Sequence, residues 1–193
     1  MARIPQLSAE TVRGRAGEWL RAMPIKLNLF GVLAQAEGCL APLMGFGGSL
    51  LSNLVLPDRD RELLVLLVAR LQSAEYEWTH HAPIAMALGL SVEAIAALNR
   101  LDLVEPFDER DRAILEFGRQ VILTSDLDDI AFDQAKRFLS DRELIEAVLA
   151  IGYYMTMCRV LKVARTDIDA DHSAALKLFN LSRKPATAVP AKA

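Results

Sequence analysis

Apolar residues recur three and four positions apart along most of the chain, and no stretch alternates apolar and polar residues in the manner of a β-strand. This pattern predicts an all-α protein. Residues with N-capping side chains (Ser8, Asn28, Ser91 and Asp141) precede several of the apolar segments, and Gly89 stands where a helix C-terminus is expected. The predicted helices cover residues 8–22, 28–33, 59–73, 75–88, 92–100, 108–123, 129–139, 142–164 and 169–181.

Two apolar segments differ from the others. Residues 63–69 are apolar almost all round, so this helix is expected at the centre of the core. The segment 42–54 carries Gly45, Gly47 and Gly48, which either let another backbone approach closely or mark a loop. The sequence leaves these two alternatives open.

The length of 193 residues fits one compact unit, and 52% hydrophobic residues can form a sizeable core. We therefore expect a single helical bundle over residues 1–181. Residues 182–193 are rich in Ala, Pro and Lys and are predicted to form a disordered tail.

Charge and hydropathy limit the classes of partner that the chain is expected to bind. A net charge of -3 without a cluster of Lys and Arg argues against nucleic acid as a partner. The longest apolar run, residues 147–158, is about half of what a bilayer requires, so it predicts a buried helix and no membrane association. Residues 1–10 do not have the apolar core of a signal peptide, and the expected location is the cytoplasm.

The two cysteines are far apart in sequence and have no metal-ligand or CxxC spacing. Cys39 and Cys158 are therefore interpreted as plain structural thiols in a reducing compartment.

Acidic, aromatic and histidine residues gather between residues 61 and 85. Glu77 and His81 are four residues apart and share one helix face, where a carboxylate can orient an imidazole and raise its basicity. If the flanking helices pack antiparallel, Glu62 lies within about one helical turn of His81. These three residues form a candidate site for proton transfer.

Each of these features has a structural alternative. A Glu and His pair on a helix is often a surface salt bridge, and the same three residues are also a conceivable metal site. Tyr76 and Trp78 are interpreted as packing residues or as walls of a substrate pocket. His80 points away from His81 and is interpreted as incidental. The acidic run Asp167, Asp169 and Asp171, followed by His172, is explained as helix capping.

These residues resemble the carboxymuconolactone decarboxylase-like superfamily, which also contains the alkylhydroperoxidase D peroxidases. The resemblance covers most of the chain and is strongest from Pro57 to Leu98. It is carried by Arg61-Glu62-Leu63, Glu75-Tyr76-Glu77-Trp78, His81, Ala85, Gly89-Leu90 and Glu93 through Ile95, with weaker matches at Asn28-Leu29-Phe30 and from Asp141 through Tyr154.

The peroxidase branch has a Glu, eleven residues, a CxxC motif, three residues and a His. Glu62 and His81 match the outer members of this spacing, but Ala74 and Glu77 stand in the cysteine positions. Because peroxide reduction needs an attacking and a resolving thiol, the resemblance places this chain in a branch without the redox pair.

The resemblance implies an all-α fold of the alkylhydroperoxidase D-like type and cofactor-free acid-base chemistry on a small carboxylated or lactone substrate. His81 would be the proton donor or shuttle, Glu62 would orient it, and Glu77 would hold its other side or act as a second acid. Arg61, Tyr76 and Trp78 are the candidate substrate-binding residues, with Arg70 a further cation for a carboxylate. The resemblance implies neither a cofactor nor a metal, and it predicts a homo-oligomer, a dimer, trimer or hexamer.

Two other functions stay open at this point. One is a peroxidase or disulfide reductase that uses Cys158 in a rearranged site. The other is a non-catalytic oligomeric module that binds a small ligand.

Overall fold

The computed structural model describes residues 2–182, and the regular elements in this range are ten α-helices, without a strand. The prediction of an all-α fold is confirmed. The helices are α1 (Gly14–Ala22), α2 (Asn28–Leu33), α3 (Glu37–Ser52), α4 (Asp58–Leu71), α5 (Glu75–Ala87), α6 (Val92–Arg100), α7 (Glu109–Thr124), α8 (Asp129–Lys136), α9 (Asp141–Ala164) and α10 (Ala174–Ser182). Apart from Ser182, which ends α10, the predicted tail lies outside the described residues.

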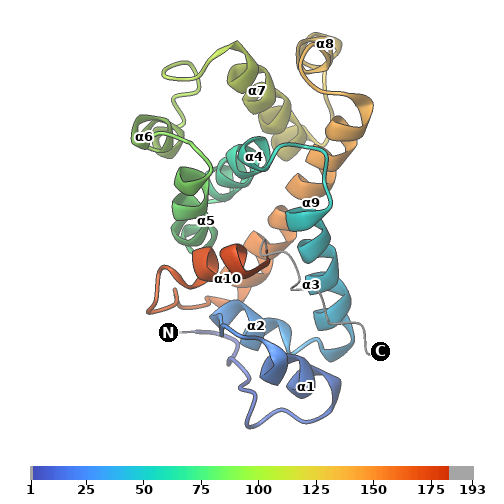
Figure 1. Cartoon of the computed structure of the whole chain (residues 1–193), viewed down its shortest axis with the longest axis vertical. Helices are drawn as coiled ribbons and strands as arrows, with labels where there is room; N and C mark the ends of the chain where they lie inside the picture. Colours follow the sequence, from blue (N-terminus) through green and yellow to red (C-terminus); the bar gives the residue numbers. More distant parts are fainter. Residues whose placement is uncertain (1, 183–193) are drawn as a thin grey trace, which may run out of the picture.

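Helix α4 lies at the centre, as its apolar sequence predicts. All residues from Asp60 to Ala69 are buried, and α4 packs against α5, α7 and α9 (Figure 1). Helices α7 and α8 lie at one end of the long axis, and α1 and α2 lie at the other. The centre of the fold therefore carries the first half of the candidate site, Glu62.

Side-chain caps fix the start of four helices. Ser91, Asp108, Asp128 and Ser140 each accept a hydrogen bond from a backbone N–H in the first turn of α6, α7, α8 and α9. Asp141 was expected to cap α9, but the cap is Ser140, which forms a reciprocal capping box with Glu143. Gly89 has φ +99° directly after Leu88, the C-cap of α5, as expected of a residue that follows a C-cap.

The N-terminal helix starts later than predicted. Ser8 and Thr11 form a local turn through their own side chains, and α1 begins only at Gly14, whose φ is +69°. The N-terminus of α1 is satisfied from another element, because Arg15 N donates to Glu37 Oε1 at 3.0 Å. Asn28 is likewise the first residue of α2 and not its cap.

The segment with three glycines is helical and not a loop, since Gly45, Gly47 and Gly48 lie within α3. Gly47 is buried, and a Cβ there would lie 2.2 Å from the hydroxyl oxygen of Tyr153 on α9. The close approach is therefore made by a tyrosine side chain and not by a backbone.

The C-terminal helix also starts later than predicted, at Ala174 instead of residue 169. Asp169 does not cap a helix. It is buried and accepts hydrogen bonds from residues of α2 and α5.

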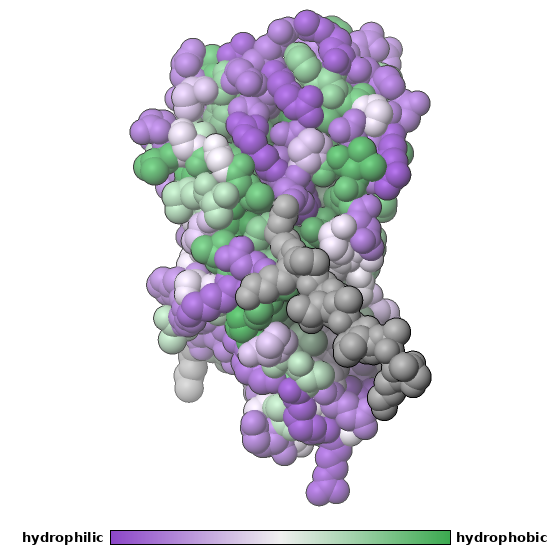
Figure 2. Space-filling view, in the orientation of Figure 1, coloured by the Kyte–Doolittle hydropathy of each residue, from purple (hydrophilic) through white to green (hydrophobic). Residues whose placement is uncertain are grey.

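Hydrophobic surface on the face drawn in Figure 2 gathers at mid-height, while the two ends of the long axis are mostly hydrophilic. Within residues 2–182, one helix, α9, is long and apolar enough to cross a membrane by length and composition alone. Of its most apolar window, 56% is buried inside the protein, and the core helix of a soluble protein passes the same test.

Candidate functional site

The pairing of α4 with α5 brings Glu62 and His81 together. A tight turn at Ser73 and Ala74 reverses the chain, so the start of α4 meets the middle of α5. Glu62 is fully buried, and its Oε2 lies 2.7 Å from Nδ1 of His81. A carboxylate here fixes the orientation of the imidazole ring.

Glu77 contacts the opposite side of the same ring. Its Oε2 lies 3.3 Å from Nε2 of His81, across one turn of α5. With a carboxylate at each ring nitrogen, the doubly protonated imidazolium is the favoured form. Burial alone would lower the pKa of His81, but the charge and hydrogen bond of Glu62 and the contact with Glu77 outweigh it and raise the pKa to about 10.

Arg61 lies behind Glu62 and not beside the imidazole. Its guanidinium is fully buried, donates to Oε1 of Glu62 at 3.2 Å and to the Leu50 carbonyl at 3.2 Å, and also pairs with Asp58. Through these contacts the guanidinium of Arg61 holds the carboxylate of Glu62 in place.

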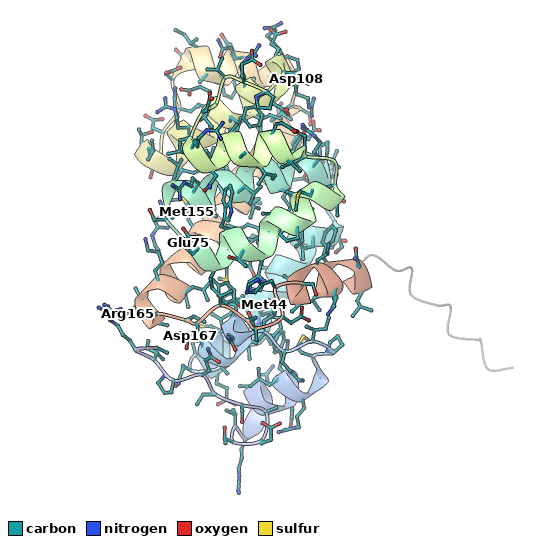
Figure 3. All side chains as sticks on the ribbon, turned by 90° about the vertical axis from the view of Figure 1, so that its left-hand side faces the viewer. Met44, Glu75, Asp108, Met155, Arg165 and Asp167 are labelled. Carbon is teal, nitrogen blue, oxygen red and sulfur yellow. The ribbon has the colours of Figure 1, made fainter. Side chains whose placement is uncertain are left out.

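A cavity of about 360 Å³ opens beside the cluster. His81 and Glu77 form part of its wall, and most other wall residues are apolar. Met44 lies near the middle of the molecule, close to α10 (Figure 3). The wall is made of Trp19, Met23, Leu27, Leu29, Phe30, Ala41, Met44, Gly45, Gly47, Gly48, Leu51, Glu77, His81, Ile84, Tyr153, Tyr154, Met157, Ala175, Leu178 and Phe179.

The candidate substrate-binding residues lie elsewhere. Arg61, Tyr76 and Trp78 are not among the described residues that line this cavity. Trp78 is half-buried and packs against the hydrophobic core, while Arg70 pairs with Glu75 at the surface.

Tyr76 belongs to a second buried polar cluster, which sequence reasoning missed. Its hydroxyl donates to Oδ2 of Asp169 and accepts from Leu29 N, and Nε2 of His80 lies 3.0 Å from the same aspartate oxygen. Burial alone would raise the pKa of Asp169, but the hydrogen bonds that it accepts hold this pKa below its usual value. His80 is therefore part of a polar cluster that ties the segment before α10 to α5. The shared face of Tyr76 and His80, four residues apart, was the one sequence signal for it.

Two tyrosines of the cavity wall were also missed. Tyr154 packs edge-on against His81, with ring centroids 4.8 Å apart, and Tyr153 packs against Tyr154 in the same manner at 5.2 Å. The inward face of α9 was predictable from its helical period, but the partner of that face was not.

The thiols are poorly placed for redox chemistry. Cys158 is buried, and desolvation together with the charge of Glu77 raises its pKa to about 12, so it stays a thiol at neutral pH. Cys39 is exposed on α3. Across residues 2–182, no group of three or more His, Cys, Asp or Glu side chains is arranged to hold a metal ion.

Solved structures share this fold. An alkylhydroperoxidase AhpD core protein from Ralstonia eutropha JMP134, described as an uncharacterized peroxidase-related protein, aligns with a TM-score of 0.75 at 16% identity, over 95% of this chain and 97% of its own. A protein from Silicibacter sp. TM1040, also described as peroxidase-related, aligns with a TM-score of 0.68 at 17% identity, over 76% and 78%. The debrominase Bmp8, as a C82A variant in complex with 2,3,4-tribromopyrrole, aligns with a TM-score of 0.66 at 18% identity, over 86% and 88%. No curated protein matches the sequence.

These likenesses define the fold as all-α, of the alkylhydroperoxidase D-like type. Residues 38–120, which include Glu62, Glu77 and His81, match the model of the Carboxymuconolactone decarboxylase family. Over these residues the chain is similar to the Carboxymuconolactone decarboxylase family, and its fold is shared with the alkylhydroperoxidase D-like structures.

Proposed function

We propose that this protein is an enzyme that performs cofactor-free acid-base chemistry of the lyase type on a small lactone or carboxylated substrate. The observation that carries the proposal is a buried imidazole, that of His81, held between Glu62 and Glu77 in the wall of an apolar cavity. Buried titratable groups with shifted pKa values that face a cavity are typical of active sites.

His81 is the proton donor of this proposal. In a decarboxylation, the bond to the carboxylate breaks, CO2 leaves, and the electron pair stays on the ring carbon, delocalised into the lactone carbonyl. His81 then supplies the proton to that carbon, directly or through Glu77, and solvent reprotonates the imidazole. Glu62 acts as a positioning residue because it holds Nδ1 and lies outside the cavity wall.

Two observations disfavour the thiol peroxidase alternative. Glu77 and Ala74 occupy the positions of the family's cysteine pair, and Cys158 carries a raised pKa. A Cys158→Ser variant should therefore have the same peroxidase activity as the parent protein. The convergence of Glu62, Glu77 and His81 equally disfavours a module without chemistry, because such a module has no need for three buried ionisable groups.

The test is a pair of reactions. CO2 release from 4-carboxymuconolactone tests decarboxylation, and deuterium uptake from D2O at the α-carbon of α-angelica lactone, followed by NMR, tests proton transfer alone. His81→Gln should lower the rate of whichever of the two reactions the parent protein catalyses by about 100-fold. His172→Gln, which changes an exposed histidine outside the cavity, should keep the rate of the parent protein. Absence of both reactions in the parent protein would remove the proposal.

A further inference from the structure

One carboxylate oxygen in the cavity wall has no partner. Glu77 is 3% exposed, and while its Oε2 contacts His81, its Oε1 is buried without a hydrogen-bond partner among the described residues. A buried acceptor of this kind costs free energy unless a ligand supplies a donor.

A hydrogen-bond donor in the same wall is also weakly satisfied. The hydroxyl of Tyr153 has the thioether sulfur of Met44, at 3.9 Å, as its hydrogen-bond partner within residues 2–182. Sulfur is a weak acceptor. Burial, with the charge of Glu77 adding to it, raises the pKa of Tyr153 above its usual value, so the phenol keeps its proton.

Gly47 sets the position of this hydroxyl. The Tyr153 oxygen lies where the Cβ of any other residue at position 47 would be, since that Cβ would come within 2.2 Å of it. The glycine of α3 thus accommodates the phenol at the wall of the cavity that both residues line.

The charges of the wall favour an uncharged ligand over an anionic one. Among the described residues that line the cavity, His81 is the one cation, without an arginine or lysine beside it. The imidazolium is already shared by Glu62 and Glu77, and Arg61 is used by Glu62 and Asp58. A carboxylated ligand would therefore enter a desolvated site with an excess of negative charge.

We propose that the ligand is an uncharged small cyclic carbonyl compound with a proton-donating group next to the carbonyl, and that Tyr153 donates to the carbonyl oxygen while Glu77 Oε1 accepts the neighbouring proton. This rests on the proposed function and narrows its substrate from carboxylated compounds and lactones to neutral lactones and related carbonyl compounds. In the reaction, Glu77 takes a proton from the carbon beside the carbonyl, and the electron pair of that C–H bond moves onto the carbonyl oxygen as an enolate. The Tyr153 hydrogen bond stabilises this negative charge until Glu77 returns a proton to the carbon.

The experiment uses oxindole, an unreactive ring whose carbonyl and N–H lie side by side, with binding to the full chain measured by calorimetry. Tyr153→Phe and Gly47→Ala should each weaken the binding of oxindole by about fivefold to tenfold, which corresponds to the loss of one hydrogen bond. Gly38→Ala, in the same helix with open space around its Cβ and outside this cavity, should bind as the parent protein does. Combining Gly47→Ala with Tyr153→Phe should add no further loss, because both changes remove one interaction.

Ligand variants test the same contacts without a folding risk. N-methyloxindole, which has no N–H to donate, should bind about fivefold to tenfold more weakly than oxindole. Indane, which has neither polar group, should bind Tyr153→Phe and the parent protein alike. Benzoate should bind more weakly than oxindole.

Three results would overturn the inference: undiminished oxindole binding in Tyr153→Phe, tighter binding of benzoate than of oxindole, or no oxindole binding at all. Each leaves the deuterium uptake assay to decide the proposed function independently. If the parent protein binds oxindole but catalyses no deuterium uptake, the proposed acid-base function is wrong and the proposed binding site stands.

Discussion

The imidazole of His81 links protonation to folding. Its pKa is about 10 in the folded protein and about 6.5 in an unfolded chain, so the folded state binds the proton more tightly. The stability that this provides is fully present below the unfolded pKa and is lost as the pH rises through the folded pKa.

We predict that the free energy of unfolding falls by about 1.4 kcal/mol per pH unit between about pH 7 and about pH 8. Urea unfolding at several pH values measures this slope. His81→Gln should abolish it, while His172→Gln should keep it. The same slope in His81→Gln and the parent protein would contradict the raised pKa. The window ends below the unfolded-state pKa of a cysteine, about 8.5, because above it Cys158, with a folded pKa raised to about 12, adds a fall of its own.

The sequence predicted the pair formed by Glu77 and His81 because four residues on one helix define a shared face. The position of Glu62 near His81 was predicted from the short turn between their two helices. Asp169 could not be predicted in the same way, since 93 residues separate it from Tyr76 and no local period connects them. Tyr153 was missed for a similar reason: its neighbour Gly47 belongs to a helix far away in the sequence.

Among the helices, α10 depends on the polar cluster of Asp169 for its position. The helix packs against α5 and α3, and the segment before it is held through Asp169 by Tyr76, His80 and Asn28 N. The carboxylate of Asp169 thus fixes the segment that leads into α10.

We predict that Asp169→Asn lowers the free energy of unfolding by about 2 kcal/mol, the range for a hydrogen bond to a charged group. Hydrogen exchange over residues 170–182 should also become faster than in the core helices. Asp167→Asn is the matched control, because the bond that Asp167 accepts from Asn28 uses its backbone carbonyl. Equal exchange in both variants would contradict this role of Asp169.

The capping box predicts a second effect at this scale. Ser140→Ala removes the side chain that caps α9 and should lower stability by about 1 kcal/mol in thermal or urea unfolding. Thr156→Ala, in the exposed middle of the same helix, changes a hydroxyl that bonds only within the helix to Gly152 and should have a smaller effect. A larger loss in Thr156→Ala than in Ser140→Ala would contradict the capping role.

Helix boundaries were predictable where a capping side chain acts on its own helix, as at Ser91. They were wrong where another part of the chain supplies the partner, as at α1, which Glu37 caps from α3. Local sequence predicts local hydrogen bonds, whereas tertiary contacts decide the remaining helix ends.

For the whole molecule, we propose the homo-oligomer that the family resemblance implies, with the outer face of α9 as its contact surface. Ile145, Val148 and Leu149 are 62%, 41% and 45% exposed and lie together on that face. Leu149→Glu should reduce the molar mass in light scattering to that of a smaller species. Val92→Glu, at an exposed apolar residue of α6, should leave the mass unchanged. A parent protein that is already monomeric would remove this proposal.

Residues near both ends of the described chain contribute to the cavity wall: Trp19 from α1 and Met23 just after it, and Leu178 and Phe179 from α10. During synthesis, Glu62, Glu77 and His81 leave the ribosome long before α10 does. A nascent chain that stops near residue 165 contains these three residues but lacks the part of the cavity wall that α10 contributes. The wall is complete only when α10 is present, so a protein truncated by proteolysis in that region would keep its ionisable residues and lose Ala175, Leu178 and Phe179 from around them.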